Sequence, residues 1–242
     1  MRPLLWLTAI CLLVFSASPL LAQSTEEPEK DECEKPEIVN ADPSYYIGLG
    51  DSRFARKEYA GAVQAYTCAI DLDSSYASTY AKRGYAYAAL LDSDAALADY
   101  DQALELDETL IAAYNNRGTL YTRLGNFGLA INDFTLVISL DPENAIAYNN
   151  RGIVHAAEGS YDMAIADFQE AIELDANYST PHASLAAVYS ALAAKHYQEF
   201  VKIAGGNARL PAGTPNEVLT AVDDSLRDGS FSVWLPLLTP AK

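Results

Sequence analysis

Two pairs of neighbouring asparagines are the residues of this sequence best suited to chemistry, and that chemistry is hydrogen bonding to a peptide. Asn115-Asn116 and Asn149-Asn150 lie 34 residues apart in the same local sequence, Ala-Tyr-Asn-Asn-Arg-Gly. A side-chain amide both donates and accepts a hydrogen bond, so it can pair with a peptide backbone without reading the peptide's side chains. The alternative is that these are ordinary solvated polar residues, which need no function.

Residues that could catalyse a reaction or bind a metal are present, but they form no recognisable motif. None of the three histidines, His155, His182 and His196, belongs to a cluster with Cys/His metal-site spacing. The sequence has no Gly-rich phosphate loop and no nucleophile motif. Acidic residues recur in segments such as Glu173-Leu174-Asp175, which are ordinary surface positions rather than an acid/base pair. We therefore expect a protein that is not an enzyme and that needs no metal or cofactor.

The net charge narrows the class of partner. The chain of 242 residues has 16 Lys and Arg against 33 Asp and Glu, which gives a formal net charge of −17. A nucleic-acid binder needs a positive stripe to replace phosphate counterions, and this sequence shows none, so we exclude that class. Broad attachment to anionic lipid is disfavoured for the same reason. The charge leaves room for a basic partner, but its simplest interpretation is a solvated, self-repelling surface.

Four columns of residues repeat every 34 positions and indicate the elements that position the asparagines. Small residues in two columns let two helices approach closely, and aromatic residues in the other two fill the space beside those contacts. A glycine inside a helix costs about 1 kcal/mol relative to alanine, so its regular recurrence indicates a packing role. The columns are the glycines Gly50, Gly84, Gly118 and Gly152, the alanines Ala62, Ala96, Ala130 and Ala164, the first aromatics Tyr46, Tyr80, Tyr114 and Tyr148, and the second aromatics Tyr66, Tyr100, Phe134 and Phe168.

Each unit of 34 residues contains two helical patterns. In the third unit, Tyr114 and Tyr121 mark the apolar stripe of the first helix, and Phe127 and Phe134 mark that of the second. Asp141-Pro142 then ends the unit, because Asp and Pro favour the first two positions of a turn. A single unit cannot bury its apolar face alone, so the units must stack. The sequence predicts helix pairs at 43–76, 77–110, 111–144 and 145–178.

With these columns, the sequence resembles the tetratricopeptide-repeat (TPR) family over residues 43–178. The resemblance implies an all-α fold, a right-handed superhelical solenoid of stacked antiparallel helix pairs with a concave groove. It also implies that the first helix of each repeat lines the groove, opposite the Tyr/Gly packing face. The groove residues that it implies are Lys82, Tyr85, Asn115, Asn116, Thr119, Arg123, Asn149, Asn150 and Ile153.

Some family members grip a carboxylate with a clamp of lysines and asparagines, and this sequence does not reproduce it. Ile47 and Asp51 stand where the clamp has lysine and asparagine. The lining is instead neutral and small, with Lys82 and Arg123 as isolated positive residues. We therefore do not expect chaperone C-termini as ligands. Asparagines at equivalent positions contact a peptide backbone in some family members, which favours Asn116 and Asn150 as binding residues.

The N-terminal 42 residues predict export. A short positive start, an uncharged apolar run and a small, turn-prone segment over residues 1–22 are the layout of a signal peptide. If the segment stays uncut, it could just span a bilayer, so a membrane anchor is the alternative. Residues 23–42 contain eight acids and two lysines and predict an acidic, disordered leader. We therefore expect a periplasmic or secreted protein.

Two cysteines, Cys33 and Cys68, remain after the predicted cleavage. An even number in an oxidising compartment suggests a disulfide between them. Cys68 occupies a repeat position that holds Gln102, Leu136 and Glu170 in the other units, and that mixture indicates an outward-facing site. A bridge would pin the leader onto the first repeat, and the alternative is two free thiols.

The repeat pattern fades after Tyr178. Residues 179–204 keep helical spacing and predict a C-terminal capping helix that covers the last repeat. The tail, 205–242, contains a capping box at Thr214-Pro215-Asn216-Glu217 that predicts a short helix near 215–228. The apolar segment 231–238 could pack on the cap, fill a groove or dock elsewhere.

The function expected from the sequence is that of a non-catalytic scaffold or adaptor. It would bind a peptide or helix of another protein in the concave groove, outside the cytoplasm. One alternative is a structural protein that associates with itself through its ends or its tail. The other is an accessory subunit of a membrane-bound envelope complex, held by an uncut signal segment.

Overall fold

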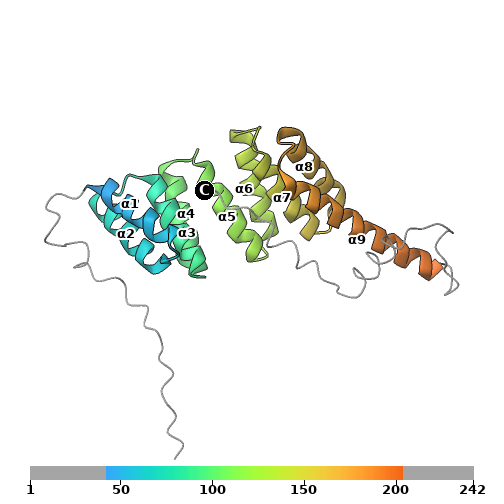
Figure 1. Ribbon diagram of the computed structural model, residues 1–242, viewed down its shortest axis with the longest axis horizontal. Coiled ribbons are helices and arrows are strands. Elements are labelled where there is room, and N and C mark those ends of the chain that lie inside the picture. The colour runs from blue at the N-terminus through green and yellow to red at the C-terminus, as the bar shows by residue number, and fades with distance from the viewer. Residues whose placement is uncertain (1–41, 204–242) are drawn as a thin grey trace, which may run out of the picture. The chain divides into compact units, whose positions relative to one another are not determined.

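Helices alone make up the regular structure of the part described by the computed structural model, residues 42–203 (Figure 1). The all-α prediction is confirmed for this part of the chain. The helices are α1 (Pro43–Ala55), α2 (Tyr59–Leu72), α3 (Ala77–Ala89), α4 (Ser93–Leu106), α5 (Ile111–Arg123), α6 (Phe127–Leu140), α7 (Ala145–Ala157), α8 (Tyr161–Leu174) and α9 (Ser179–Ile203).

The helices form antiparallel pairs that stack in chain order. α1 packs on α2, α3 on α4, α5 on α6 and α7 on α8, and each pair packs on the next through α2–α3, α4–α5 and α6–α7. α9 packs on α8 and α7, where the sequence predicts a capping helix at 179–204. The result is the predicted right-handed superhelical solenoid, in which the odd-numbered helices form one layer and the even-numbered helices the other.

Helix boundaries follow from local side-chain chemistry. The Oδ1 atom of Asp42 accepts a hydrogen bond from the backbone N–H of Tyr45 at 3.0 Å, and Pro43 takes the first helical position of α1. Asn144 caps α7 in the same way through the N–H of Ala147 at 3.0 Å. Such a cap typically stabilises a helix by about 1 kcal/mol, so these residues fix where the repeat begins.

The turn inside each pair requires a left-handed residue. Gly125 and Gly159 supply it with φ of 76° and 81°, and glycine adopts this conformation without steric cost. Lys57 and Leu91 adopt φ of 62° and 65° at the matching positions, where a side chain costs roughly 1–2 kcal/mol. The first two turns therefore have the same backbone geometry as the others, although Lys57 and Leu91 disfavour a positive φ.

The glycine column lies where an aromatic ring leaves no room for a side chain. A Cβ atom added to Gly118 would lie 3.0 Å from Cε1 of Phe134, and one added to Gly152 would lie 2.8 Å from Cε1 of Phe168. The ring of Tyr66 lies against Gly50 in the same way. Glycine therefore sets how closely the first helix of each pair approaches the second.

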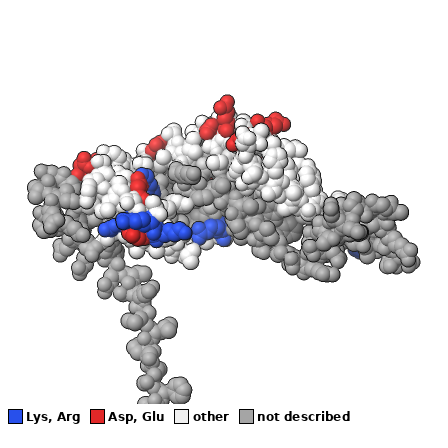
Figure 2. Space-filling model, viewed as in Figure 1, with Lys and Arg blue, Asp and Glu red and all other residues white. Residues whose placement is uncertain are grey.

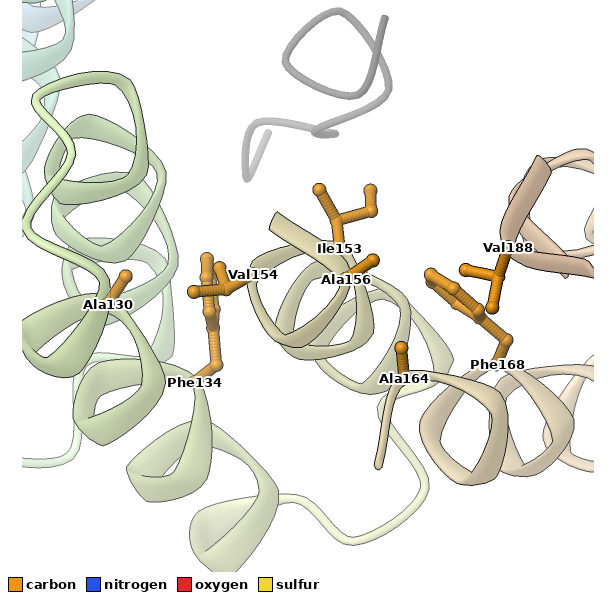
Figure 3. Packing of buried hydrophobic residues seen from close by; sticks show 8 residues of the cluster. All are labelled: Ala130, Phe134, Ile153, Val154, Ala156, Ala164, Phe168 and Val188. Atoms are coloured by element: carbon orange, nitrogen blue, oxygen red, sulfur yellow. The ribbon is translucent and has the colours of Figure 1, made fainter. Parts of the chain in front are cut away.

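The core is a series of small clusters along the stack. Figure 3 shows Val154 of α7 against Phe134 of α6, and Val188 of α9 against Phe168 of α8. The alanine column Ala62, Ala96, Ala130 and Ala164 is fully buried between the helices of each pair. The first tyrosine column is less buried, because Tyr80, Tyr114 and Tyr148 keep part of their surface exposed.

Several predicted segments lie outside the described residues. They are the signal peptide at 1–22, all but the last residue of the leader at 23–42, and the tail at 205–242 with its short helix near 215–228. Within the described ranges, no helix combines the length and apolar character needed to cross a membrane.

Candidate functional site

The four asparagines lie together on the odd-numbered helices α5 and α7. Asn149 and Asn150 are fully buried, and Asn115 and Asn116 nearly so. The alternative of solvated surface residues is therefore wrong for all four. We call this mostly buried group the inner face; it consists of Asn115, Asn116 and Thr119 of α5 and of Asn149, Asn150 and Ile153 of α7.

Two amide oxygens on the inner face lack a hydrogen bond. Within the described part of the chain, the Oδ1 atoms of Asn115 and Asn149 are buried and have no donor. The Nδ2 atom of Asn149 donates to the Oδ1 atom of Asn150 over 3.4 Å, a long bond. An unsatisfied buried acceptor costs about 1–3 kcal/mol. A hydrogen-bond donor that reached the Oδ1 atom of Asn115 or Asn149 would remove that cost.

Ser184 of α9 is a further buried polar residue without a partner in the described part of the chain, and it belongs to the neighbouring column of Asn116 and Asn150. It lies 34 residues after Asn150, which itself lies 34 residues after Asn116. Its hydroxyl is buried, and no hydrogen-bond partner is present among residues 42–203. Sequence reasoning missed this residue because the packing columns fade after Tyr178, but the spacing alone could have found it.

Lys82 is not the isolated positive residue that the sequence predicts. Its Nζ atom lies 2.7 Å from Oδ2 of Asp51, and the hydroxyl of Tyr66 donates to Oδ1 of Asp51 at 2.8 Å. Burial, together with Asp51, raises the pKa of Tyr66. Asp51 therefore joins α1, α2 and α3, and the charge of Lys82 is already paired.

The remaining predicted groove residues divide between packing and exposure. Tyr85 stacks on Phe54 with ring centroids 4.8 Å apart, so its ring joins the first two repeats. The hydroxyl of Thr119 donates to the backbone carbonyl of Asn115 at 2.8 Å. Ile153 is buried and points away from Phe134 in Figure 3, whereas Arg123 is exposed.

A series of ion pairs, which sequence reasoning missed, joins the two helices in the second, third and fourth repeats. Arg117 of α5 binds Asp133 of α6 through two bonds, Nε to Oδ2 at 2.9 Å and Nη2 to Oδ1 at 2.7 Å. Arg83 and Asp99 form the same bidentate pair in the second repeat. Arg151 and Asp167 form it in the fourth. Arginine and aspartate at these columns are separated by 16 residues, a spacing that becomes a contact only when the two helices fold back on each other.

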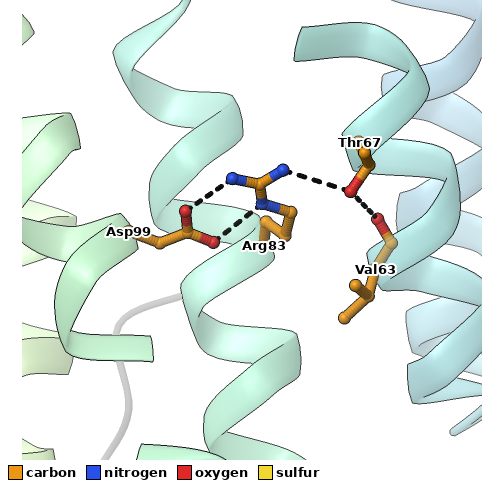
Figure 4. A network of polar contacts seen from close by, with 4 residues as sticks. All are labelled: Val63, Thr67, Arg83 and Asp99. Carbon is orange, nitrogen blue, oxygen red and sulfur yellow. Dashed lines mark hydrogen bonds and ion pairs between the residues drawn. The ribbon is translucent and has the colours of Figure 1, made fainter. Parts of the chain in front are cut away.

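The third guanidinium nitrogen of each arginine reaches the preceding repeat. Figure 4 shows the Nη1 atom of Arg83 donating to the hydroxyl of Thr67 at 3.1 Å, and that hydroxyl donating to the carbonyl of Val63 at 2.9 Å. Arg117 reaches Oδ1 of Asp101 at 2.6 Å. Each arginine therefore connects three helices, and we call these contacts the arginine stitches.

The arginines that form these stitches also lie over three rings of the first tyrosine column. The guanidinium carbon lies 5.5 Å from the ring centroid in the pairs Arg83–Tyr80, Arg117–Tyr114 and Arg151–Tyr148. The cation therefore covers a ring that would otherwise face solvent. Burial lowers the pKa of Arg117, but hydrogen bonds and charge from Asp133 and Asp101 outweigh it, so the net direction is upward.

Cys68 is disulfide-bonded. Its side chain is buried, whereas Leu136 and Glu170 at the matching positions are exposed, as expected for an outward-facing position. Cys33 lies outside the described residues, and its pairing with Cys68 stays a prediction.

Charge is unevenly distributed over the described surface. In Figure 2, acidic side chains lie along the upper edge, and Lys and Arg form a band lower down over the N-terminal helices. Across residues 42–203, no group of three or more His, Cys, Asp or Glu side chains is placed to hold a metal ion.

Family models match the chain throughout most of the four repeats. A family model for the tetratricopeptide repeat matches residues 111–144 and 145–178, a second matches 77–110, and a TPR repeat model matches 50–90. Together these matches run from residue 50 to residue 178, more than half of the 242 residues. The chain is a tetratricopeptide-repeat protein. TPR arrays generally act as non-catalytic scaffolds for protein–protein contacts, and their stacked repeats present extended binding surfaces.

Solved structures show the same fold. A structure of MamA, residues 41 to the end, from Desulfovibrio magneticus RS-1 is 18% identical, with a TM-score of 0.58 over 78% of this chain and 98% of that one. A second MamA crystal structure is 19% identical, with a TM-score of 0.55 over 78% of this chain and 94% of that one. At these identities the likeness concerns the solenoid alone. No match to the chain was found among curated proteins.

Proposed function

We propose that this TPR protein is an adaptor whose inner face binds an extended peptide segment of a partner protein. The observation that carries the proposal is the pair of buried, unpartnered amide oxygens on Asn115 and Asn149. A peptide backbone supplies N–H donors at regular intervals, so it offers what these oxygens lack. The carbonyl acceptors that it also carries suit the hydroxyl of Ser184, which can donate.

The spacing of the amides suits an extended chain. Neighbouring packed helices lie roughly 8–10 Å apart, and an extended chain rises about 3.3 Å per residue. Matching asparagines on α5 and α7 would therefore meet a peptide near every third residue. Because the amides contact backbone rather than side chains, recognition of sequence falls to the residues around them, such as the exposed Arg123.

The test separates binding from folding. The double variant Asn115→Ala/Asn149→Ala removes both unpartnered oxygens, and Ala81 at the matching position of α3 is buried, so alanine suits the fold. We expect the melting temperature to stay the same or to rise, because a buried unsatisfied acceptor is lost. A peptide selected from a random library on the native chain should bind the variant at least about tenfold more weakly, a loss of about 1.4 kcal/mol.

The matched control is Asn132→Ala, which removes an exposed amide from α6. It should leave the affinity for the selected peptide unchanged. Equal affinity of the native chain and the double variant would place the binding site away from the inner face and sink the proposal.

We also propose that the protein acts outside the cytoplasm. The signal-peptide layout of residues 1–22 and the disulfide at Cys68 support this, because disulfides persist in oxidising compartments. Cell fractionation with mass spectrometry should recover a chain that begins after the predicted cleavage and has no free thiol at Cys68. A full-length, reduced chain in the cytoplasmic fraction would contradict the proposal.

A further inference from the structure

The lining of the odd-numbered helices becomes more buried toward the C-terminal end of the stack. One repeat position shows the trend, since it is exposed in α1, partly buried in α3 and α5, and 1% exposed in α7. It is occupied in turn by Asp51, Tyr85, Thr119 and Ile153. A second position follows the same order, because Asn116 keeps 7% of its surface exposed and Asn150, in the same local sequence, none.

The stacking of the helices does not account for the burial of Ile153. α5 packs between α3 and α7, and α7 packs between α5 and α9, so Thr119 and Ile153 have equivalent helical neighbours. In Figure 3 the side chain of Ile153 points away from the rings of Phe134 and Phe168. Equivalent neighbours predict similar exposure, yet the larger isoleucine is the more buried of the two. The difference indicates that a further segment covers the inner face around Ile153.

The C-terminal tail, 205–242, is the segment best placed to do so. It follows α9, which packs on α7 and α8 at the buried end of the lining, whereas the acidic leader precedes α1 at the exposed end. The tail itself lies outside the described residues. Its last part suits the site chemically, because residues 229–241 include no charged side chain and the inner face has none either.

We propose that the chain's own apolar segment 231–238 occupies the inner face beside Ile153, so that a partner peptide must displace it. This inference rests on the function proposed above and adds the regulation of that site. The side chains of the segment, which include Trp234 and four aliphatic leucine or valine residues, would otherwise be exposed to water as a contiguous apolar patch. Its backbone also carries an N–H donor at every residue except Pro236, as an extended partner peptide would.

The tail is long enough to return to the inner face. Ser184 and Ile203 are 19 residues apart on α9, about 29 Å along the helix axis. The 27 residues from 204 to 230 connect the end of α9 to the apolar segment. Even with the helix predicted near 215–228, they span up to about 60 Å when the rest is extended. A segment tethered in this way has an effective concentration on the order of millimolar at the site, so it competes with a partner that is far more dilute.

Trp234 reports the contact directly, because Trp6 is the only other tryptophan of the chain. In the full chain with Trp6→Phe, acrylamide should quench the fluorescence of Trp234 several-fold less than it does in the urea-unfolded chain. Ile153→Thr places on α7 the residue that α5 has at the same position, so it suits the fold, and it should make Trp234 easier to quench. Ile146→Thr, at an exposed position of the same helix, is the matched control and should leave the quenching unchanged.

A competition measurement tests the regulation. The peptide selected from a library on the native chain should bind Leu235→Asp at least about tenfold more tightly, because a weakened tail leaves a larger fraction of the inner face open. Leu210→Asp makes the same change in the tail outside the apolar segment and should leave the affinity unchanged. Addition of the peptide to the Trp6→Phe chain should also raise the quenching of Trp234, since the peptide displaces the segment.

Three results would overturn the proposal. One is a Trp234 that is quenched as strongly in the folded chain as in the unfolded one. Another is protection of Trp234 that disappears on dilution, since the segment would then belong to a second copy. The third is equal peptide affinity of the native chain and Leu235→Asp. If Asn115→Ala/Asn149→Ala still weakens peptide binding in that case, the function proposed above stands and the regulation by the tail alone fails.

Discussion

Folding lowers the pKa of His155, and the cause is the burial of its ring. It occupies the position of Tyr87 and Tyr121 in the preceding repeats, and it is buried there. Its Nδ1 atom has no partner among the described residues, and its Nε2 atom lies 3.9 Å from Oδ2 of Asp167. Burial lowers the pKa of His155, and Asp167 only partly offsets this, so the folded state favours the neutral ring.

Acid should therefore weaken the fold through His155. The unfolded chain binds a proton near the ordinary pKa of about 6.5, whereas the folded chain binds it only at lower pH. Stability is thus complete above that pKa and falls as the pH drops below it, by no more than about 1.4 kcal/mol for each pH unit. His155→Tyr should remove this part of the pH dependence in urea unfolding between pH 7.5 and pH 5. The exposed His196, changed to Gln, is the control, and an identical pH profile in native chain and His155→Tyr would contradict the argument.

At the scale of single residues, the sequence predicts steric roles better than polar ones. The glycine at Gly118 and the ring at Phe134 recur together, and the structure places them in contact because each leaves the other only one place to pack. The isolated charge predicted for Lys82 was wrong, because Asp51 lies 31 residues away and meets it only across the stack. An ion pair between distant residues depends on how the helices cross, and the 34-residue spacing of the sequence does not give that crossing geometry.

Among the helix pairs, the first repeat lacks the arginine stitch and shows what can replace it. Leu49 and Ala65 stand where the third repeat has Arg117 and Asp133. Ala65 is buried like the aspartate that it replaces. The same kind of helix pair therefore forms with two apolar residues or with an ion pair at these positions. A buried ion pair need not add stability over an apolar contact of similar volume, but a single buried charge left alone is costly.

A double-mutant cycle on the third repeat follows from this comparison. Asp133→Ala alone should cost about 3 kcal/mol of unfolding free energy, because it leaves Arg117 partly buried with only Asp101 to pair with. Arg117→Leu alone should cost a similar amount. The double variant reproduces the first repeat and should cost clearly less than the two together, with a coupling of about 1–3 kcal/mol in urea titration. Strict additivity would show that the two residues do not act as a pair.

The helix pairs themselves were predictable, and the reason lies in their turns and caps. Asp141-Pro142 ends one pair, and Asn144 caps the next, so local chemistry fixes the boundary before any tertiary contact forms. Leu91, like Lys57, is an exception, because its left-handed φ of 65° is a conformation that residues with a side chain disfavour. There the packing of α3 on α4 imposes a turn that the local sequence does not favour.

For the described solenoid as a whole, contacts run mainly between neighbouring pairs. α9 meets α8 and α7, and the pairs before it meet chiefly their own neighbours. The stability of such an array is a sum of repeat terms and nearest-neighbour terms. The sequence predicts this architecture because the columns report each interface separately. It could not predict which inner-face oxygens lack a donor, because that depends on how α5, α7 and α9 lie against one another.

The interface between α8 and α9 therefore tests how many neighbouring helices lose stability when one buried contact is removed. Val188 of α9 is fully buried against Phe168, so Val188→Ala should cost about 2 kcal/mol through lost contact and a small cavity. Because neighbours share the interface, amide hydrogen exchange should speed up most in α7, α8 and α9 and least in α1 and α2. Tyr189→Ala, at the next and half-exposed position, should leave the exchange pattern close to that of the native chain. An equal loss of protection in every helix would mean that the repeats open as one cooperative unit, and the nearest-neighbour description would then fail for this protein.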